Sequence, residues 1–136
     1  MGNITQTAAN VASGAGATPA HGTAGETIVA GDVLYLKAAD SELYKAINTS
    51  AAAAAAVGIA LDGGGNGQPI TYQGAGVINP GGTVAAGVTY CVSGTAGKIA
   101  LDSDITSTMF KTVLGVGTTT SLIKMGIIAS GVAIAA

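Results

Sequence analysis

The stretch Val33-Leu34-Tyr35-Leu36-Lys37 has the branched and aromatic side chains that favour a β-strand. Turn-forming residues follow it (Ala38-Ala39-Asp40-Ser41), and the chain then returns as Glu42-Leu43-Tyr44-Lys45-Ala46-Ile47. Two such runs around a short turn predict a β-hairpin. Residues 57–61 and 70–73 predict further short strands. The alanine run 51–56 predicts one helical turn or a packed crossing segment, because it is too short to form an independent helix.

The second half of the chain restates this pattern. In each half a glycine-bounded apolar run leads into a strand with a central tyrosine, which is Tyr35 in the first half and Tyr90 in the second. A turn, a return strand and two later apolar runs then follow in the same order. The matched segments are 25–36 with 81–92, 43–46 with 98–101, 57–60 with 114–117, and 70–78 with 122–133. We therefore predict two pseudo-repeats, over about 25–79 and 81–133.

The expected fold is all-β: a small barrel or sandwich built from two similar halves that each contain a β-hairpin. Residues 1–24 differ from the rest, since they consist largely of small and polar residues without a hydrophobic period of 2 or 3.6. We expect a flexible or extended N-terminal arm there, followed by a β domain at 25–136. Such an arm either stays disordered or orders on a neighbouring molecule.

The chain is poor in charge. Charged residues make up 9% and apolar residues 49%, whereas ordinary globular proteins carry about 25% charged residues. The formal net charge is only −2. Two explanations remain open: other protein covers much of the surface, or the many Gly, Ala, Ser and Thr residues make a neutral surface that water still wets.

The charge balance argues against two classes of partner. Nucleic-acid binding depends on Lys and Arg that neutralise phosphates, but this chain has five lysines, no arginine and seven acidic residues. Binding to a membrane surface through a basic patch is disfavoured for the same reason. We therefore expect neither nucleic acid nor membrane as a partner.

Residues for catalysis or metal binding are scarce. The one histidine, His21, lies in the expected arm, and the one cysteine, Cys91, lies in an apolar run where a buried, inert thiol is expected. Asp102-Ser103-Asp104 is interpreted as a capped turn rather than a calcium site. The glycine loop 62–67 lacks the Gly-Lys ending of a phosphate-binding loop. We expect no enzymatic activity, no cofactor and no metal site.

Six short runs share a pattern of small and apolar residues. They are Ile28-Val29-Ala30-Gly31-Asp32-Val33-Leu34-Tyr35-Leu36, Ala56-Val57-Gly58-Ile59-Ala60-Leu61, Gly67-Gln68-Pro69-Ile70, Gly87-Val88-Thr89-Tyr90-Cys91-Val92-Ser93, Lys98-Ile99-Ala100 and Leu114-Gly115-Val116-Gly117. Together, over about residues 25–125, they resemble the capsid decoration (cement) proteins of tailed bacteriophages.

This resemblance implies a structural protein of the virion, made in the host cytoplasm, that binds the outer surface of an assembled capsid. Its partners would be the major capsid protein and further copies of itself, and as a homotrimer it would bridge neighbouring capsomers. A second reading is a head-fibre, tail or other virion adhesin subunit, and a third is a small-molecule binder or enzyme. We expect capsid or subunit contacts at Glu26, Asp32, Tyr35, Lys37, Lys45 and Tyr90.

Overall fold

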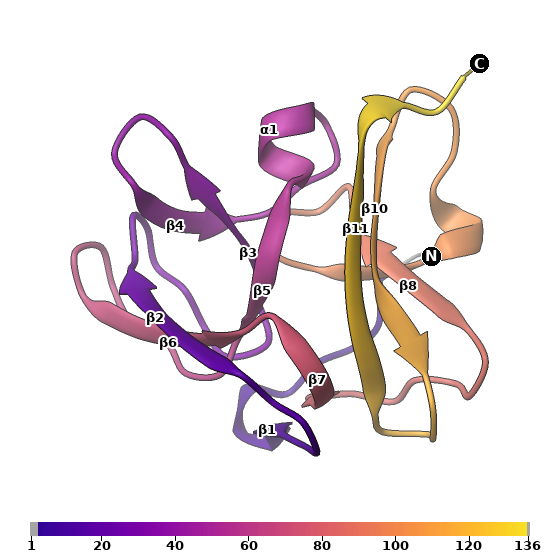
Figure 1. The fold of residues 1–136 in the computed structure, drawn as a ribbon, viewed down its shortest axis with the longest axis horizontal. Helices are drawn as coiled ribbons and strands as arrows, with labels where there is room; N and C mark the ends of the chain where they lie inside the picture. The colour runs from indigo at the N-terminus through magenta and orange to yellow at the C-terminus, as the bar shows by residue number, and fades with distance from the viewer. Residues whose placement is uncertain (1–2, 136) are drawn as a thin grey trace.

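The hairpin expected around residues 33–47 is present in the computed structural model, which describes residues 3–135 (Figure 1). Strand β3 pairs with β4 so that Tyr35 lies opposite Tyr44. Residues 1, 2 and 136 of the expected arm and β domain lie outside the described residues. The hairpin belongs to an antiparallel sheet with strand order β2-β6-β5-β3-β4. Its strands are β2 (Pro19–Thr23), β3 (Val33–Lys37), β4 (Glu42–Lys45), β5 (Ala56–Ala60) and β6 (Pro69–Gln73).

A second antiparallel sheet has strand order β1-β7-β11-β10-β8-β9. Its strands are β1 (Val11–Ser13), β7 (Ala75–Pro80), β8 (Thr89–Val92), β9 (Ile99–Leu101), β10 (Phe110–Gly117) and β11 (Ile123–Ala133). Helical structure among the described residues is limited to α1 (Ala51–Ala54) and two short 3₁₀ turns, η1 (Ala8–Asn10) and η2 (Asp102–Asp104). The all-β prediction is confirmed, and of the two alternatives expected for the alanine run the structure has the helical turn, α1. Ser50 caps it by accepting a hydrogen bond from the Ala53 amide.

The two sheets have the same strand order. Without β1, the second sheet runs β7-β11-β10-β8-β9, and the first runs β2-β6-β5-β3-β4. Strands β2 to β6 therefore correspond, in chain order, to β7 to β11. In both sheets a bulge interrupts the pairing next to the hairpin, between β3 and β5 and between β8 and β10. The structure moves the boundary between the halves. By sequence, β7 belongs to the end of the first unit. In the structure it lies in the second sheet, at the position that β2 has in the first sheet.

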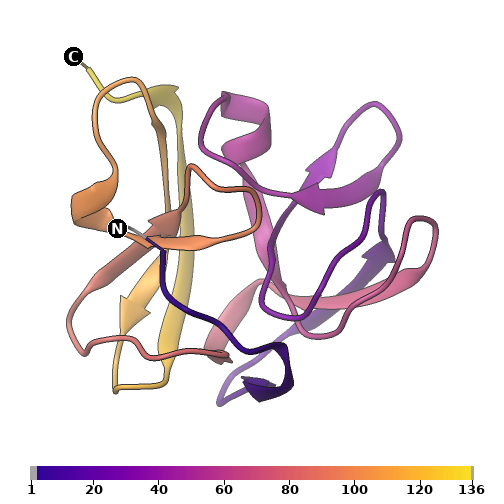
Figure 2. The same ribbon diagram turned by 180° about the vertical axis from the view of Figure 1, so that it is seen from behind.

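The N-terminal segment is extended, but it lies along its own chain. Strand β1 pairs with β7, and β2 pairs with β6. Figure 2 shows residues 3–10 crossing beside the second sheet before β1 begins. Small residues make this close approach possible, because a Cβ on Gly76 would lie closer than 3.0 Å to the backbone of Gly16, and both glycines have positive φ. The composition that suggested disorder instead permits tight packing.

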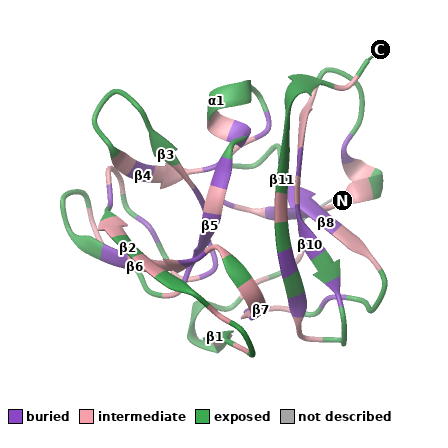
Figure 3. Ribbon diagram, in the orientation of Figure 1, coloured by how far each residue is buried: buried purple, intermediate pink, exposed green. Residues whose placement is uncertain are grey.

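Three groups of buried residues stabilise the fold (Figure 3). The central core lies between the sheets and includes Ile59 from the first sheet and Leu114 from the second. A second group, which includes Leu34 and Ile70, fills the curl of the first sheet. The third is smaller and surrounds Cys91 in the second sheet. Because side chains alternate between the faces of a strand, Val33 reaches the central core while its neighbour Leu34 reaches the other group.

Candidate interaction surface

Chemically reactive groups are mostly dispersed over the part of the chain that the structure describes, although Asp102 contacts both Cys91 and Lys111. Over residues 3–135 no three His, Cys, Asp or Glu side chains gather as a metal site would require. His21 is exposed on β2, where its Nδ1 atom lies 3.2 Å from the Thr71 hydroxyl. Burial, together with a hydrogen bond to Asp102, raises the pKa of the Cys91 thiol to about 12. The thiol therefore stays protonated at neutral pH and is a poor nucleophile.

Two of the six expected contact residues are buried inside the chain. Tyr90 is only 2% exposed, and its hydroxyl accepts a hydrogen bond from the Ala85 amide at 2.9 Å. Asp32 is 3% exposed, and its Oδ2 accepts from the Val29 amide at 3.0 Å, which closes the turn before β3. Neither side chain lies on the surface of the chain, so the prediction that they contact another molecule is corrected to a structural role.

Asp32 also illustrates the electrostatics near the start of β3. Burial raises the pKa of its carboxyl, while the hydrogen bond from Val29 and the nearby Lys45 and Lys98 ammonium groups lower it in part. Glu26 lies in the same region, and its Oε2 accepts a hydrogen bond from the Lys45 amide at 2.9 Å. These groups fasten the segment before β3 to the edge strand β4.

The outer part of the β3–β4 hairpin presents polar, charged and apolar groups to the exterior. Lys37 is exposed and its Nζ lies 4.8 Å from the centre of the Tyr44 ring, close enough for a cation–π contact. The Tyr44 hydroxyl donates a 2.6 Å hydrogen bond to Asp40. This bond lowers the pKa of Asp40 and raises that of Tyr44 to about 12. Leu36 is 52% exposed, and because it pairs with Leu43 its side chain points to the other face of the hairpin.

Four expected contact residues belong to this region: Tyr35 and Lys37 on one face of the hairpin, Lys45 on the other face, and Glu26 against the backbone of β4. Sequence analysis did not single out Leu36, Asp40 or Tyr44. Tyr44 could have been found, because the predicted hairpin register places it opposite Tyr35, and the two rings lie 6.1 Å apart. We call both faces of this outer part of the hairpin, residues 35–37, 40, 42, 44 and 45, the hairpin surface.

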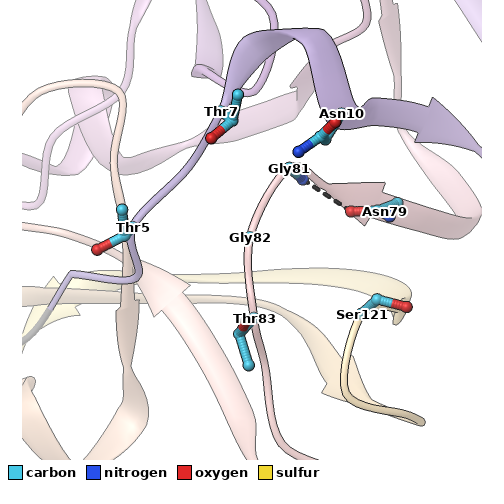
Figure 4. A pocket seen from close by; sticks show the side chains of 8 residues that line it. All are labelled: Thr5, Thr7, Asn10, Asn79, Gly81, Gly82, Thr83 and Ser121. Carbon is cyan, nitrogen blue, oxygen red and sulfur yellow. Dashed lines mark hydrogen bonds between the residues drawn. The ribbon is translucent and has the colours of Figure 1, made fainter.

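A polar hollow of about 500 Å³ lies at the other end of the fold (Figure 4). The N-terminal segment, the loop after β7 and the turn between β10 and β11 line it. Within it the Gly81 amide donates a hydrogen bond to the Asn79 side chain. Its lining residues are Thr5, Thr7, Asn10, Asn79, Gly81, Gly82, Thr83 and Ser121. None of them is an acid, a base or a thiol, so the hollow offers hydrogen bonds but no catalytic group.

A scan against protein-family models finds no family that matches this chain, and a search of curated proteins finds no match. Among residues 3–135, no helix has the length and apolar character needed to span a membrane.

Proposed function

We propose that this protein is a structural component of a tailed-phage virion that binds the outer surface of the assembled capsid and bridges neighbouring capsomers as a homotrimer. The observation that carries the proposal is the family-like pattern of apolar runs over residues 25–125. The low charge of the chain and the dispersed reactive groups of its described part agree with a binding role.

The hairpin surface is the part of the chain that we propose contacts the capsid. Near its tip it presents the exposed apolar side chain of Leu36 on one face and the charges of Lys37 and Glu42 on the other, and contacts with Tyr44 hold Lys37 and Asp40 in place. Such a mixture of apolar and charged groups is typical of surfaces that bind a separately folded partner. The hydrogen bond and the cation–π contact hold the groups in place before binding, which lowers the entropy lost on association.

Stabilisation of the shell would follow from mass action. A ligand that binds only the assembled shell favours assembly over dissociation by about 2.7 kcal/mol per site when its free concentration is 100 times the dissociation constant. In a trimer three weak contacts act together, because the first contact raises the effective concentration of the other two. No single contact therefore has to be strong.

Co-sedimentation tests this proposal. Purified protein is mixed with mature, undecorated shells of the phage whose genome carries the gene, and in parallel with unassembled capsid protein. We expect saturable binding to the shells in multiples of three copies and little binding to the unassembled subunit. Equal binding to both, or binding to neither, would contradict the proposal.

One observation favours the adhesin alternative. The polar hollow is lined only by hydroxyl, amide and backbone groups, and these suit a neutral ligand rich in hydroxyl groups. Binding of whole host cells or their isolated surface glycans in place of shells, reduced by Thr83→Val in the hollow, would support that alternative.

A further inference from the structure

The segment before β1, residues 3–10, lies across the second sheet and is fastened to it at two distant places (Figure 2). The Ile4 amide donates a 2.9 Å hydrogen bond to the Ile99 carbonyl in β9. The Thr7 amide donates a 2.7 Å bond to the Gly81 carbonyl, directly after β7. Since both partners are far away in sequence, the segment can dock only after the second sheet has formed. We call residues 3–10 the clasp.

The side chain of Gln6 connects the clasp to both sheets. Its Nε2 atom donates one hydrogen bond of 2.9 Å to the Gly31 carbonyl and another of 2.8 Å to the Pro80 carbonyl. Pro80 ends β7 of the second sheet, and the Gly31 amide is itself bonded to the Ala60 carbonyl in β5 of the first sheet. A side-chain amide has two N–H donors, so Gln6 gives one to each sheet.

Glycines let the backbone of the clasp approach the loop after β7. A Cβ on Gly81 would lie closer than 3.0 Å to the Thr7 carbonyl oxygen, and a Cβ on Gly82 would lie closer than 3.0 Å to the Thr5 carbonyl oxygen. Gly82 is not among the glycines with positive φ, so its own backbone conformation would accept alanine. At that position the closed clasp is the reason why a side chain does not fit.

Most of the clasp is exposed, in contrast to the body formed by the two sheets. Six of its eight residues are exposed, while Ile4 is half-buried and packs against the central core. Within the body, the fully buried Val33 donates its amide to the Gly97 carbonyl of the other sheet at 2.9 Å. Exposed segments with few apolar contacts open at a lower free energy than a buried core. The clasp can therefore open while the sheets stay packed.

We infer that the clasp opens and closes as a unit on the intact pair of sheets, and that Gln6 locks it in the closed position. The polar hollow depends on this movement, because Thr5, Thr7 and Asn10 belong to the clasp and form part of its wall (Figure 4). The hollow is complete only while the clasp is closed. A ligand that occupied the hollow would therefore hold the clasp closed.

Amide hydrogen exchange, followed by NMR on the full chain, tests whether the clasp opens by itself. Relative to their rates in an unfolded chain, the Ile4 and Thr7 amides should exchange at least about 100-fold faster than the Val33 amide. Low concentrations of urea should speed the exchange of Val33 but not of the two clasp amides, since local opening exposes little surface.

A mutation in the body separates local from global opening. Ile59→Val removes one methyl group from the central core, so it should speed the exchange of Val33 by about 10-fold and leave the two clasp amides unchanged. If the clasp amides were protected as strongly as Val33 in the wild type, or if Ile59→Val sped them equally, the clasp would open only with the whole fold. Either result would overturn the inference.

Two substitutions test the lock. Gln6→Glu keeps the shape of the side chain but places carboxylate oxygens against two carbonyls, and Gly82→Ala pushes on the clasp without changing charge. Each should speed the exchange of the clasp amides by about 10-fold or more. The controls are Gln68→Glu, whose side-chain oxygen already accepts a hydrogen bond in an exposed loop, and Gly126→Ala, whose Cβ meets open space.

Circular dichroism checks that every variant is folded, and the two test positions guard against one that is not. Both controls should leave the clasp amides at their wild-type rates. A Gln6→Glu variant whose clasp amides exchange no faster than those of Gln68→Glu would contradict the role of Gln6.

Discussion

The first and second sheets share one strand order but differ in what they expose. The first has short central strands and an edge hairpin with Lys37, Asp40 and Glu42 near its tip. The second has two long central strands, and after Lys124 its last strand contains no charge. The strands that the two sheets share form the buried cores. The parts that differ are the charged hairpin, to which we assign capsid binding, and the longer end of β11.

The largest expected difference concerns Tyr35 and Tyr90, which occupy matched positions in the two halves. Tyr90 is buried in the central core and its hydroxyl is hydrogen-bonded, whereas Tyr35 is half-buried. Tyr90→Ala should lower the free energy of unfolding by about 3–5 kcal/mol. Tyr35→Ala should lower it by about 1–2 kcal/mol. Urea denaturation measures both, and equal losses would show that the halves bury this position alike.

A second pair of positions should behave alike. Gly58 and Gly115 lie in the counterpart strands β5 and β10, and a Cβ on either would lie closer than 3.0 Å to the backbone of the next strand. Each Gly→Ala change should therefore destabilise the fold by about 1–3 kcal/mol. Gly126→Ala is the control, because a Cβ there meets open space. If Gly58 or Gly115 tolerated alanine as well as Gly126 does, the two halves would not share this packing.

The smallest expected effects are opposite pH dependences of stability. Burial raises the pKa of Asp32 above its ordinary value of 3.8. Between pH 3.8 and the raised pKa, the folded state holds a proton that the unfolded state has lost, so stability falls as pH rises through this range. Lys111, 2.6 Å from Asp102, lowers the pKa of Asp102, so its contribution is present above pH 3.8 and is lost as pH falls through the native pKa.

Denaturation curves of Asp32→Asn and Asp102→Asn across this acidic range test the two signs. Relative to the wild type, Asp32→Asn should gain stability as pH rises. Asp102→Asn should lose about 1 kcal/mol or less, because that ion pair is partly exposed. Parallel curves for the wild type and both variants would contradict the two assignments.

The hairpin and the similar halves could be predicted from sequence because they depend on local alternation and on spacing that recurs. The N-terminal strands could not, because they consist largely of small residues and their partners, such as Ile78 for Ser13, are distant in sequence. The sequence match of 122–133 with 70–78 pairs one strand with two, because the structure divides 70–78 between β6 and β7 but makes 123–133 the single strand β11. Contact residues chosen by type alone included the buried Asp32 and Tyr90, whose burial depends on tertiary packing.

The central claim is that the hairpin surface, and not the second sheet, binds the capsid. The most direct test compares binding of two matched double variants to undecorated shells: Leu36→Gln with Lys37→Gln on the hairpin, and Val116→Gln with Lys124→Gln on neighbouring strands of the second sheet. Each pair removes one exposed apolar side chain and one lysine. We predict about 10-fold or weaker affinity for the hairpin variant and wild-type affinity for the other. Unchanged binding by the hairpin variant, with loss in the second-sheet variant, would contradict the claim.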